Sequence, residues 1–263
     1  MPATLVFDIE TVPDVAGYRM LLDLDPALPD ADVAELAFQR RRAASGQDFL
    51  PLHLQRVVAI ACVLREGEGL RAWSLGAPAD GEAELIQRFY DGIEKYTPQL
   101  VSWNGGGFDL PVLHYRGLIH GATASRYWDL GDGDYADSRE FRYNNYISRY
   151  HARHLDLMDL LSMYQPRATA PLDQIARLAG FPGKLGMEGS QVWSAFQAGR
   201  IGDIRSYCET DVLNTWLVYL RFQLMRGALD GEAYARELSL VRSTIAKLDA
   251  VHWREFLAHW PAG

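Results

Sequence analysis

Apolar and polar residues alternate at the start of the chain, and this alternation predicts a β-strand. The segment TLVFDIE, residues 4–10, places Leu5, Phe7 and Ile9 on one face. The opposite face carries Val6 and two carboxylates, Asp8 and Glu10. Two like charges so close together repel each other unless a cation lies between them.

The pattern that follows alternates between strand-like and helix-like segments. The pattern of residues 19–56 predicts a helical insertion that is interrupted by Pro and Gly residues. Compact apolar runs predict strands at 56–64, 70–76 and 99–104, and helical periodicity predicts helices at 81–96 and from 108 onward. This order predicts an α/β sheet with an antiparallel hairpin on one side.

The composition is that of a globular protein with 263 residues, of which 48% are hydrophobic and 23% charged. We expect one domain: a main body over 1–229, with insertions at about 19–56 and 121–153, and a helical C-terminal extension over 230–263 of the same domain. A run of 18 apolar residues is absent, which argues against a membrane span or a signal peptide. Cys62 and Cys208 read as reduced, buried thiols rather than a disulfide, and we expect a cytoplasmic protein.

Three acidic motifs carry the candidate chemistry, and each has a simpler structural explanation. Asp8 and Glu10 offer the hard oxygen ligands that Mg²⁺ or Mn²⁺ prefers, although such a pair can also be a solvated turn. In SWNGGGFDLPVL, Asn104 and Phe108 precede Asp109 at the start of a predicted helix, where a carboxylate also suits the helix dipole.

The third motif is SYCETDVLNTW, in which Tyr207 and Asp211 stand four residues apart in a long amphipathic helix. Their side chains therefore project from one face of that helix. The simpler explanation is a core tyrosine beside a surface aspartate.

Taken together and in this order, the motifs Asp-x-Glu, Asn-x-x-x-Phe-Asp and Tyr-x-x-x-Asp resemble those of the DEDD exonuclease superfamily. Tyrosine at position 207 points to the Tyr-containing branch. The segments FDIET, NGGGFDLPVL, YCETDV and GKLGMEGSQVW are most similar to predicted 3′–5′ exonucleases related to the proofreading domain of family B DNA polymerases. The resemblance covers about residues 3–225.

The resemblance implies a ribonuclease-H-like fold, with a mixed five-stranded sheet, one antiparallel strand and helices on both faces. It implies that Asp8, Glu10 and Asp211 hold two divalent ions, that Asp8 bridges them, and that Asp109 acts through coordinated water. Two ions about 4 Å apart can activate water and stabilise an in-line displacement. Because a tyrosine has a pKa near 10, Tyr207 is expected to position the attacking water and not to act as its base.

The substrate implied is the 3′ end of a single-stranded nucleic acid, DNA in preference to RNA, with nucleoside 5′-monophosphates as products. The formal net charge of −8 means that any basic surface is local. The segment 139–154 interleaves arginines with aromatic residues, which suits single-strand binding through Arg142 and Arg149. The same aromatic residues could instead fill a small local core.

Lys184 lies in a Gly-rich loop that does not match a P-loop, and it reads as either a phosphate contact or a solvated turn residue. Asp156 and Asp159 are candidates to orient a catalytic group and not ligands. No polymerase domain fits in the remaining residues, so a stand-alone nuclease is expected.

Two other classes compete with the nuclease interpretation. A haloacid-dehalogenase-like phosphatase would explain FDIETV but wants Asp where Glu10 stands, and it leaves NGGGFD and Tyr207 unexplained. A nucleic-acid-binding module with an inactive exonuclease fold would usually have lost a ligand, whereas all five functional positions are intact here.

Overall fold

The computed structural model describes residues 3–261, and these form one mixed sheet of five strands. In chain order the strands are β1 Thr4–Pro13, β2 Gln55–Glu66, β3 Gly69–Ser74, β4 Gln99–Ser102 and β5 His154–Asp156. Their spatial order is β3-β2-β1-β4-β5. β2 runs antiparallel to both neighbours, while β4 is parallel to β1 and to β5. The expected mixed five-stranded sheet with one antiparallel strand is confirmed.

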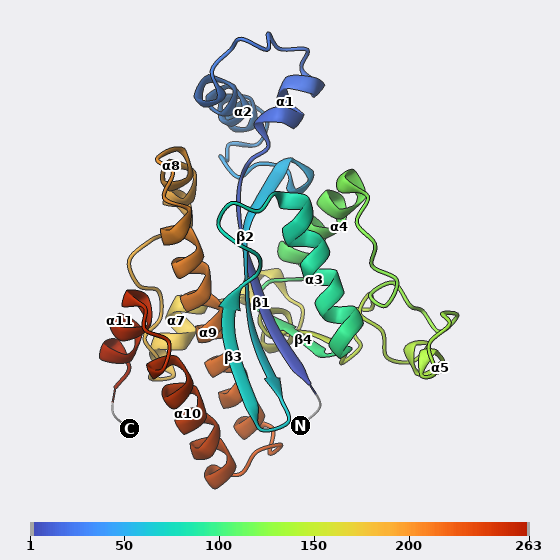
Figure 1. Cartoon of the computed structure of the whole chain (residues 1–263), viewed down its shortest axis with the longest axis vertical. Helices are drawn as coiled ribbons and strands as arrows, with labels where there is room; N and C mark the ends of the chain where they lie inside the picture. The colour runs from blue at the N-terminus through green and yellow to red at the C-terminus, as the bar shows by residue number, and fades with distance from the viewer. Residues whose placement is uncertain (1–2, 262–263) are drawn as a thin grey trace.

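Helices cover both faces of this sheet (Figure 1). The α-helices are α1 Val15–Leu21, α2 Asp30–Ser45, α3 Glu82–Tyr96, α4 Asp109–His120, α5 Ser138–Phe141, α6 Leu157–Leu161, α7 Leu172–Leu178, α8 Val192–Gln197, α9 Ile201–Met225, α10 Gly231–Ala246 and α11 Val251–His259. Short 3-10 helices are η1 Leu52–Leu54, η2 Pro166–Ala168 and η3 Gly189–Gln191. Within the described range, no helix is both long and apolar enough to cross a membrane.

The alternation along β1 divides the protein interior into two apolar cores. Leu5, Phe7 and Ile9 pack in the core that includes α3 and α4. Val6 packs in the other core, which includes much of α9. Because side chains alternate along a strand, Asp8 and Glu10 project from the same face as Val6, toward α9.

β1 is longer than the sequence predicted, because it continues past both carboxylates to Pro13. Glu10 pairs with Ala59 of β2, but Thr11 pairs with Val57, so the register shifts at this point. The shift is a β-bulge, a feature that bends a strand and often re-aims a side chain beside an active site. The prediction ended the strand at the charges, whereas the long neighbour β2 supplies pairing partners beyond them.

The predicted helical insertion at 19–56 is found as α2 and η1, with α1 beginning slightly earlier, at Val15. It stands beyond the carboxyl end of β1 (Figure 1) and has a small apolar core of its own. The second insertion, at 121–153, contains only the short helix α5. The C-terminal segment forms α10 and α11, which pack against α9. The boundary at residue 229 stays a prediction.

Candidate active site

Carboxylates from β1 and α9 meet at the carboxyl end of β1. Asp8 and Asp211 line the same cavity, and Glu10 lies two residues along the same face of β1. Ligand atoms of Asp8, Glu10 and Cys208 all lie within 4.8 Å of one another. Pairing with β4 ends at Val6, so this end of the sheet is open where α/β sheets place their ligands.

Asp109 forms a hydrogen bond to β1 beyond the point where its pairing with β4 ends. Its Oδ1 accepts a hydrogen bond of 3.1 Å from the backbone N–H of Ile9, which stands between the two carboxylates of β1. Asp109 occupies the first turn of α4 and is buried. It therefore fixes the backbone on which Asp8 and Glu10 stand, in addition to any role as a helix-terminal carboxylate.

The glycines of the second motif serve the tight packing of the loop after β4. A Cβ on Gly105 would lie 2.3 Å from Ser102 Oγ, so only glycine fits there. The carboxylate of Asp156 accepts hydrogen bonds from the backbone N–H groups of Asn104 and Gly106, at 3.0 and 2.8 Å. Asp156 thus orients this loop, whereas its expected role in orienting a catalytic group stays a prediction.

The third motif brings Tyr207 and Asp211 to the site on the buried face of α9. Asp211 is only 5% exposed, so the alternative of a surface aspartate is wrong. Lys184 Nζ lies 2.5 Å from the Tyr207 hydroxyl and 3.2 Å from Asp211 Oδ2. Lys184 therefore contacts both residues of the motif, while its side chain stays 39% exposed.

The electrostatics of the site show an excess of negative charge. Burial raises the pKa of Asp8 well above its ordinary value, and the neighbouring Asp109, Glu10 and Asp211 raise it further. Burial and Asp211 raise the pKa of Glu10 in the same way. Burial disfavours the charged form of Lys184, but Asp211, Asp8 and Glu10 together outweigh it, and the pKa of the lysine is raised.

These residues fit a divalent cation. Asp211 Oδ1 is buried and has no hydrogen-bond partner among the described residues, whereas its other oxygen contacts Lys184. An unpaired buried carboxylate oxygen beside two mutually repelling carboxylates is a donor set that Mg²⁺ or Mn²⁺ would satisfy. Sequence reasoning missed Cys208, whose Sγ lies 3.4 Å from Asp8 Oδ2, because a lone cysteine in an apolar run reads only as core.

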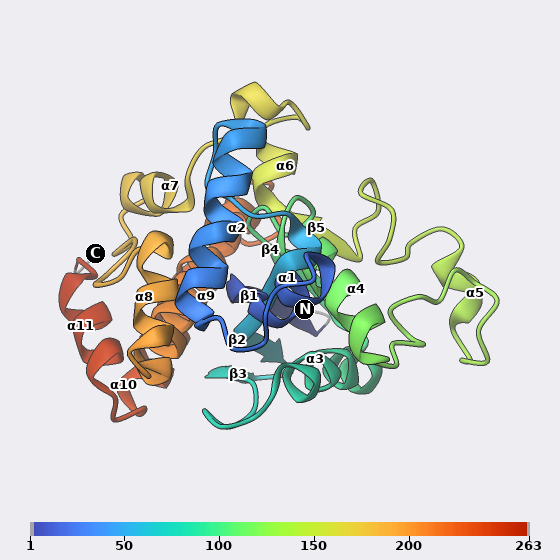
Figure 2. The same cartoon turned by 90° about the horizontal axis from the view of Figure 1, so that it is seen from above.

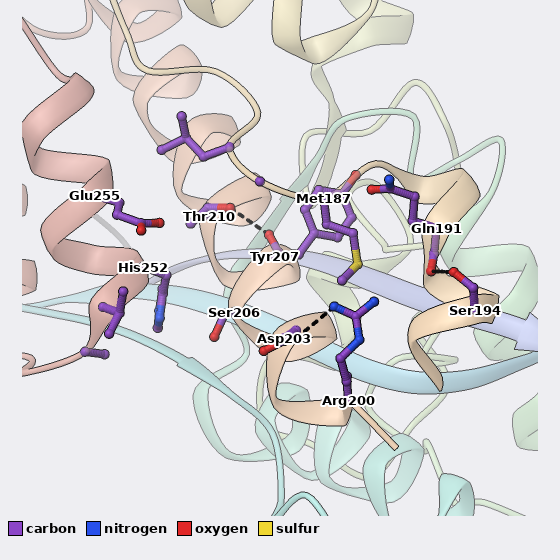
Figure 3. Close-up of a pocket in the computed structure, with 14 residues that line it drawn as sticks. Met187, Gln191, Ser194, Arg200, Asp203, Ser206, Tyr207, Thr210, His252 and Glu255 are labelled. Carbon is purple, nitrogen blue, oxygen red and sulfur yellow. Dashed lines mark hydrogen bonds and ion pairs between the residues drawn. The ribbon is translucent and has the colours of Figure 1, made fainter. Parts of the chain in front are cut away.

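Cavities flank the carboxylates on several sides. One of about 810 Å³ is lined by Asp8, Asn104, Lys184 and Asp211, and by Trp103. A second of about 570 Å³ lies on the side of Glu10 and Phe108. A third, of about 740 Å³, has Tyr207 on its wall and extends between η3, α8, α9 and α11 (Figure 3).

The Arg-rich segment at 139–154 contains both buried and exposed side chains. Phe141 and Tyr146 are buried, and Arg153 stacks 3.9 Å from the Phe141 ring centroid, so the segment does form a small core. Arg149 is exposed and its Nη2 lies 2.6 Å from Asp159 Oδ2, near the glycine loop.

Arg142 is not brought together with the carboxylates. Its Nε donates to Gly131 O at 3.3 Å. In the same segment the Tyr146 hydroxyl donates to the carbonyl of Pro98, just before β4 begins. Pro98 lies at the end of the sheet opposite the carboxylates.

The buried acids predict that the metal-free protein becomes less stable as the pH rises. Burial raises the pKa of Asp109 from 3.8 to about 7. The unfolded chain releases this proton near pH 4, but the folded chain keeps it until about pH 7. The contribution of Asp109 to the free energy of unfolding is therefore fully present below pH 4 and is lost as the pH rises to about 7. We expect the melting temperature in EDTA to fall by about 5 °C or more between pH 5 and 7.5.

The matched variant is Asp109→Asn, which cannot titrate and should show a smaller fall over the same range. Divalent metal should reverse the fall in the parent protein, because bound metal replaces the protons. Identical pH dependence of melting in the parent and in Asp109→Asn would contradict the prediction. Differential scanning fluorimetry with and without Mn²⁺ makes the comparison.

Among solved structures, the chain is similar to the family B DNA polymerase from the hyperthermophilic archaeon Pyrobaculum calidifontis, with a TM-score of 0.50 and 18% identity. The match covers 86% of this chain and 25% of the polymerase chain, so this likeness concerns the fold alone. No protein with a curated description matches the sequence.

A family model matches residues 47–260, a range that contains the second and third motifs and both C-terminal helices. Asp8 and Glu10 precede the matched range, and it is the structure that places them beside Asp211. The family is not that of haloacid-dehalogenase-like phosphatases. The chain belongs to the family of predicted 3′–5′ exonucleases related to the exonuclease domain of PolB.

Proposed function

We propose that this protein is a metal-dependent 3′–5′ exonuclease that releases nucleoside 5′-monophosphates from single-stranded nucleic acid, with DNA preferred to RNA. The observation that carries the proposal is the convergence of Asp8, Glu10 and Asp211 beside Tyr207 and Lys184. The family assignment supports the reaction class. The inactive binding module remains the alternative, and the intact set of acidic residues speaks against it.

The carboxylates would hold two divalent ions, Mg²⁺ or Mn²⁺. Asp8, Glu10 and Asp211 would supply the ligand oxygens, with the unpaired Asp211 Oδ1 as a ready ligand. Asp109 would act through water and by fixing the backbone at Ile9. When bound, such ions activate water and stabilise the entering and leaving oxygens of an in-line displacement.

Tyr207 would position the attacking water. Burial and the nearby Asp211 raise the pKa of Tyr207 above its ordinary value, so the hydroxyl keeps its proton at neutral pH and is not a base. Lys184 donates to this hydroxyl and fixes its orientation. The lysine would also place a positive charge where a substrate phosphate enters the cavity that it lines.

The strand is proposed to approach through the cavity beside Asn104 and Trp103. Arg149 lies beyond it, with its guanidinium 5.0 Å from the ring centroid of Tyr164. Exposed Tyr150 packs edge-on against Tyr164 at 5.2 Å. A cation beside an exposed ring and a half-buried one suits phosphate and base contacts without sequence readout. Arg142 would be reached only by a longer strand.

Arg149→Ala should weaken binding of a single strand and reduce its salt dependence. Removing one phosphate contact lowers the slope of log K against log salt by about 0.7. Arg142→Ala should do so only with longer strands, and Arg88→Ala, an exposed arginine on α3, is the control. Turnover at saturating substrate should change little. Unchanged affinity and slope for Arg149→Ala would remove Arg149 from the strand path.

The reaction itself is tested with strands labelled at either end. With Mn²⁺ or Mg²⁺, a 5′-labelled strand should give a ladder that shortens from the 3′ end, and a 3′-labelled strand should release labelled mononucleotide at once. Chelation should stop both. Binding without any metal-dependent hydrolysis would favour the inactive module, and a comparison of DNA with RNA strands measures the preference.

A further inference from the structure

We infer that Asn214 is a positioning residue for Lys184, because its carboxamide holds the peptide of Gly183, the preceding residue. The inference rests on the proposed function, which gives Lys184 its role at the site. Asn214 follows Asp211 by three residues and Tyr207 by seven, so the three side chains lie on one face of α9. One helix would thus carry a metal ligand, the tyrosine and the group that places the lysine.

Asn214 pairs with both polar groups of the Gly183 backbone. Its Oδ1 accepts from the Gly183 N–H at 3.1 Å, and its Nδ2 donates to the Gly183 carbonyl at 2.8 Å. The same Nδ2 donates to the carbonyl of Thr210, one turn earlier in α9, at 3.0 Å. A reversed carboxamide would turn its oxygen toward two carbonyls, so these contacts fix its orientation. Asn214 is only 1% exposed, and water therefore does not compete for its bonds.

Gly183 is also packed closely against α7. Its φ of +74° lies in the left-handed region, and a Cβ there would lie 2.5 Å from Asp173 Oδ1 and 2.6 Å from Arg177 Cγ. The same Asp173 Oδ1 accepts a hydrogen bond of 2.8 Å from the Lys184 N–H. α7 packs against α9, and Figure 2 shows both helices on one side of the sheet. The peptide that joins Gly183 to Lys184 is therefore fixed between these two helices.

Lys184 needs a fixed backbone because its side chain is long and partly exposed. The side chain is 39% exposed, yet its Nζ lies 2.5 Å from the Tyr207 hydroxyl and 3.2 Å from Asp211 Oδ2. Lysine loses much rotamer entropy when its amine is held in one place. A backbone that also moved would add to this loss, so the amine would contact the two oxygens in a smaller fraction of molecules.

The hydrogen bonds of Asn214 distinguish its role from packing within the helix. Two other buried polar residues of α9 bond to the helix itself, since Thr210 Oγ1 donates to the Tyr207 carbonyl and Thr215 Oγ1 to the Asp211 carbonyl. Asn214 instead bonds to a segment 31 residues away in the sequence. An aspartate could accept from Gly183 but not donate to it, and an apolar residue could do neither. The position therefore calls for a carboxamide.

The first test measures the Lys184 amine directly and does not depend on hydrolysis. Lysine occurs only at positions 95, 184 and 247, and the exposed Lys95 and Lys247 serve as internal references. The protein is treated briefly in EDTA with an amine-reactive ester, and mass spectrometry gives the labelling rate of each lysine. The variant is Asn214→Ser, whose hydroxyl can bond back to the helix but is too short to hold Gly183.

We expect Lys184 to be labelled several-fold more slowly than the two references in the parent protein, and at a rate near theirs in Asn214→Ser. An amine held by two oxygens is less available to the reagent than a free one. Equal labelling of Lys184 in the parent and in Asn214→Ser would overturn the inference, whether or not the parent hydrolyses nucleic acid.

The second test is a double-mutant cycle on hydrolysis. Asn214→Ser should lower kcat/KM about tenfold and Lys184→Ala about 10²-fold. Because Asn214 acts through Lys184, Asn214→Ser should cause no further loss in the Lys184→Ala background. Leu220→Ala truncates a buried residue on a different face of α9, so it controls for destabilisation and should keep the parental rate well below the melting temperature. Additive losses from the two substitutions would overturn the inference.

A substitution on α7 tests the inference even if Asn214→Ser fails to fold. Asp173 is half-buried, so Asp173→Ala removes the acceptor of the Lys184 N–H with little effect on folding. It should speed the labelling of Lys184 and lower kcat/KM, and Asp173→Asn, which keeps an oxygen, should do so less. Parental labelling and rate in Asp173→Ala would overturn the inference. An absence of hydrolysis by the parent would instead overturn the proposed function, while the labelling still decides how Lys184 is held.

Discussion

Asp8→Asn is expected to abolish hydrolysis and, at the same time, to stabilise the metal-free protein. Asparagine keeps the shape of the side chain but removes the charge that burial and three neighbouring acids disfavour. The rate should fall by at least about 10³-fold, since a carboxylate proposed to hold the metal is lost. The melting temperature in EDTA should rise, because the repulsion among the carboxylates is relieved.

The response to metal separates this explanation from a folding defect. Ligands that bind only the folded state raise its melting temperature, so Mn²⁺ should stabilise the parent and have little effect on Asp8→Asn. Asp91→Asn, an exposed residue of α3, is the matched control and should behave as the parent. Full metal-dependent activity in purified Asp8→Asn would refute the assignment of the site.

The parts of the site that depend on local periodicity were predictable from the sequence. Alternation with a period of two correctly placed Asp8 and Glu10 on one face of β1, opposite Phe7. The helical spacing of four residues correctly placed Tyr207 and Asp211 together on α9. In both cases the relevant neighbours are set by a single element, so the pattern alone fixes them.

Other parts of the site depend on contacts between distant segments, and no local pattern encodes them. Asp109 contacts the backbone of Ile9, which is 100 residues away in the sequence, and Lys184 contacts the hydroxyl of Tyr207, which is 23 residues away. The acceptor role of Asp156 depends on how the glycine loop folds over it. Such contacts follow from the sheet order and the loop geometry.

The Arg-rich segment shows why composition alone locates a binding surface poorly. The sequence pattern does not distinguish Arg142 from Arg149. In the structure, the segment that carries them packs around a core of Phe141 and Tyr146. Arg149 is left near the glycine loop and Arg142 near Gly131. Of the aromatic residues that could stack on bases here, Phe141 and Tyr146 are buried and stabilise the insertion, whereas Tyr143 and Tyr150 are exposed.

Tyr207→Phe is expected to leave a slow but active enzyme, about 10²-fold below the parent in kcat. The substitution keeps the ring packed in the buried face of α9 and removes only the hydroxyl that contacts Lys184. The acidic residues proposed to hold the ions are unchanged, so metal-dependent stabilisation and KM should stay near parental values.

The form of the pH profile distinguishes a positioning hydroxyl from a base. Since the pKa of Tyr207 lies above its ordinary value of 10.0, loss of the hydroxyl should lower the rate equally at every pH between about 6 and 9. Tyr90→Phe is the matched control, because it removes a hydroxyl from another buried tyrosine, on α3. Rates at saturating metal and substrate should follow the order Tyr90→Phe, then Tyr207→Phe, then Asp8→Asn. If Tyr207→Phe retains the parental rate, the tyrosine is a core residue and another group holds the water.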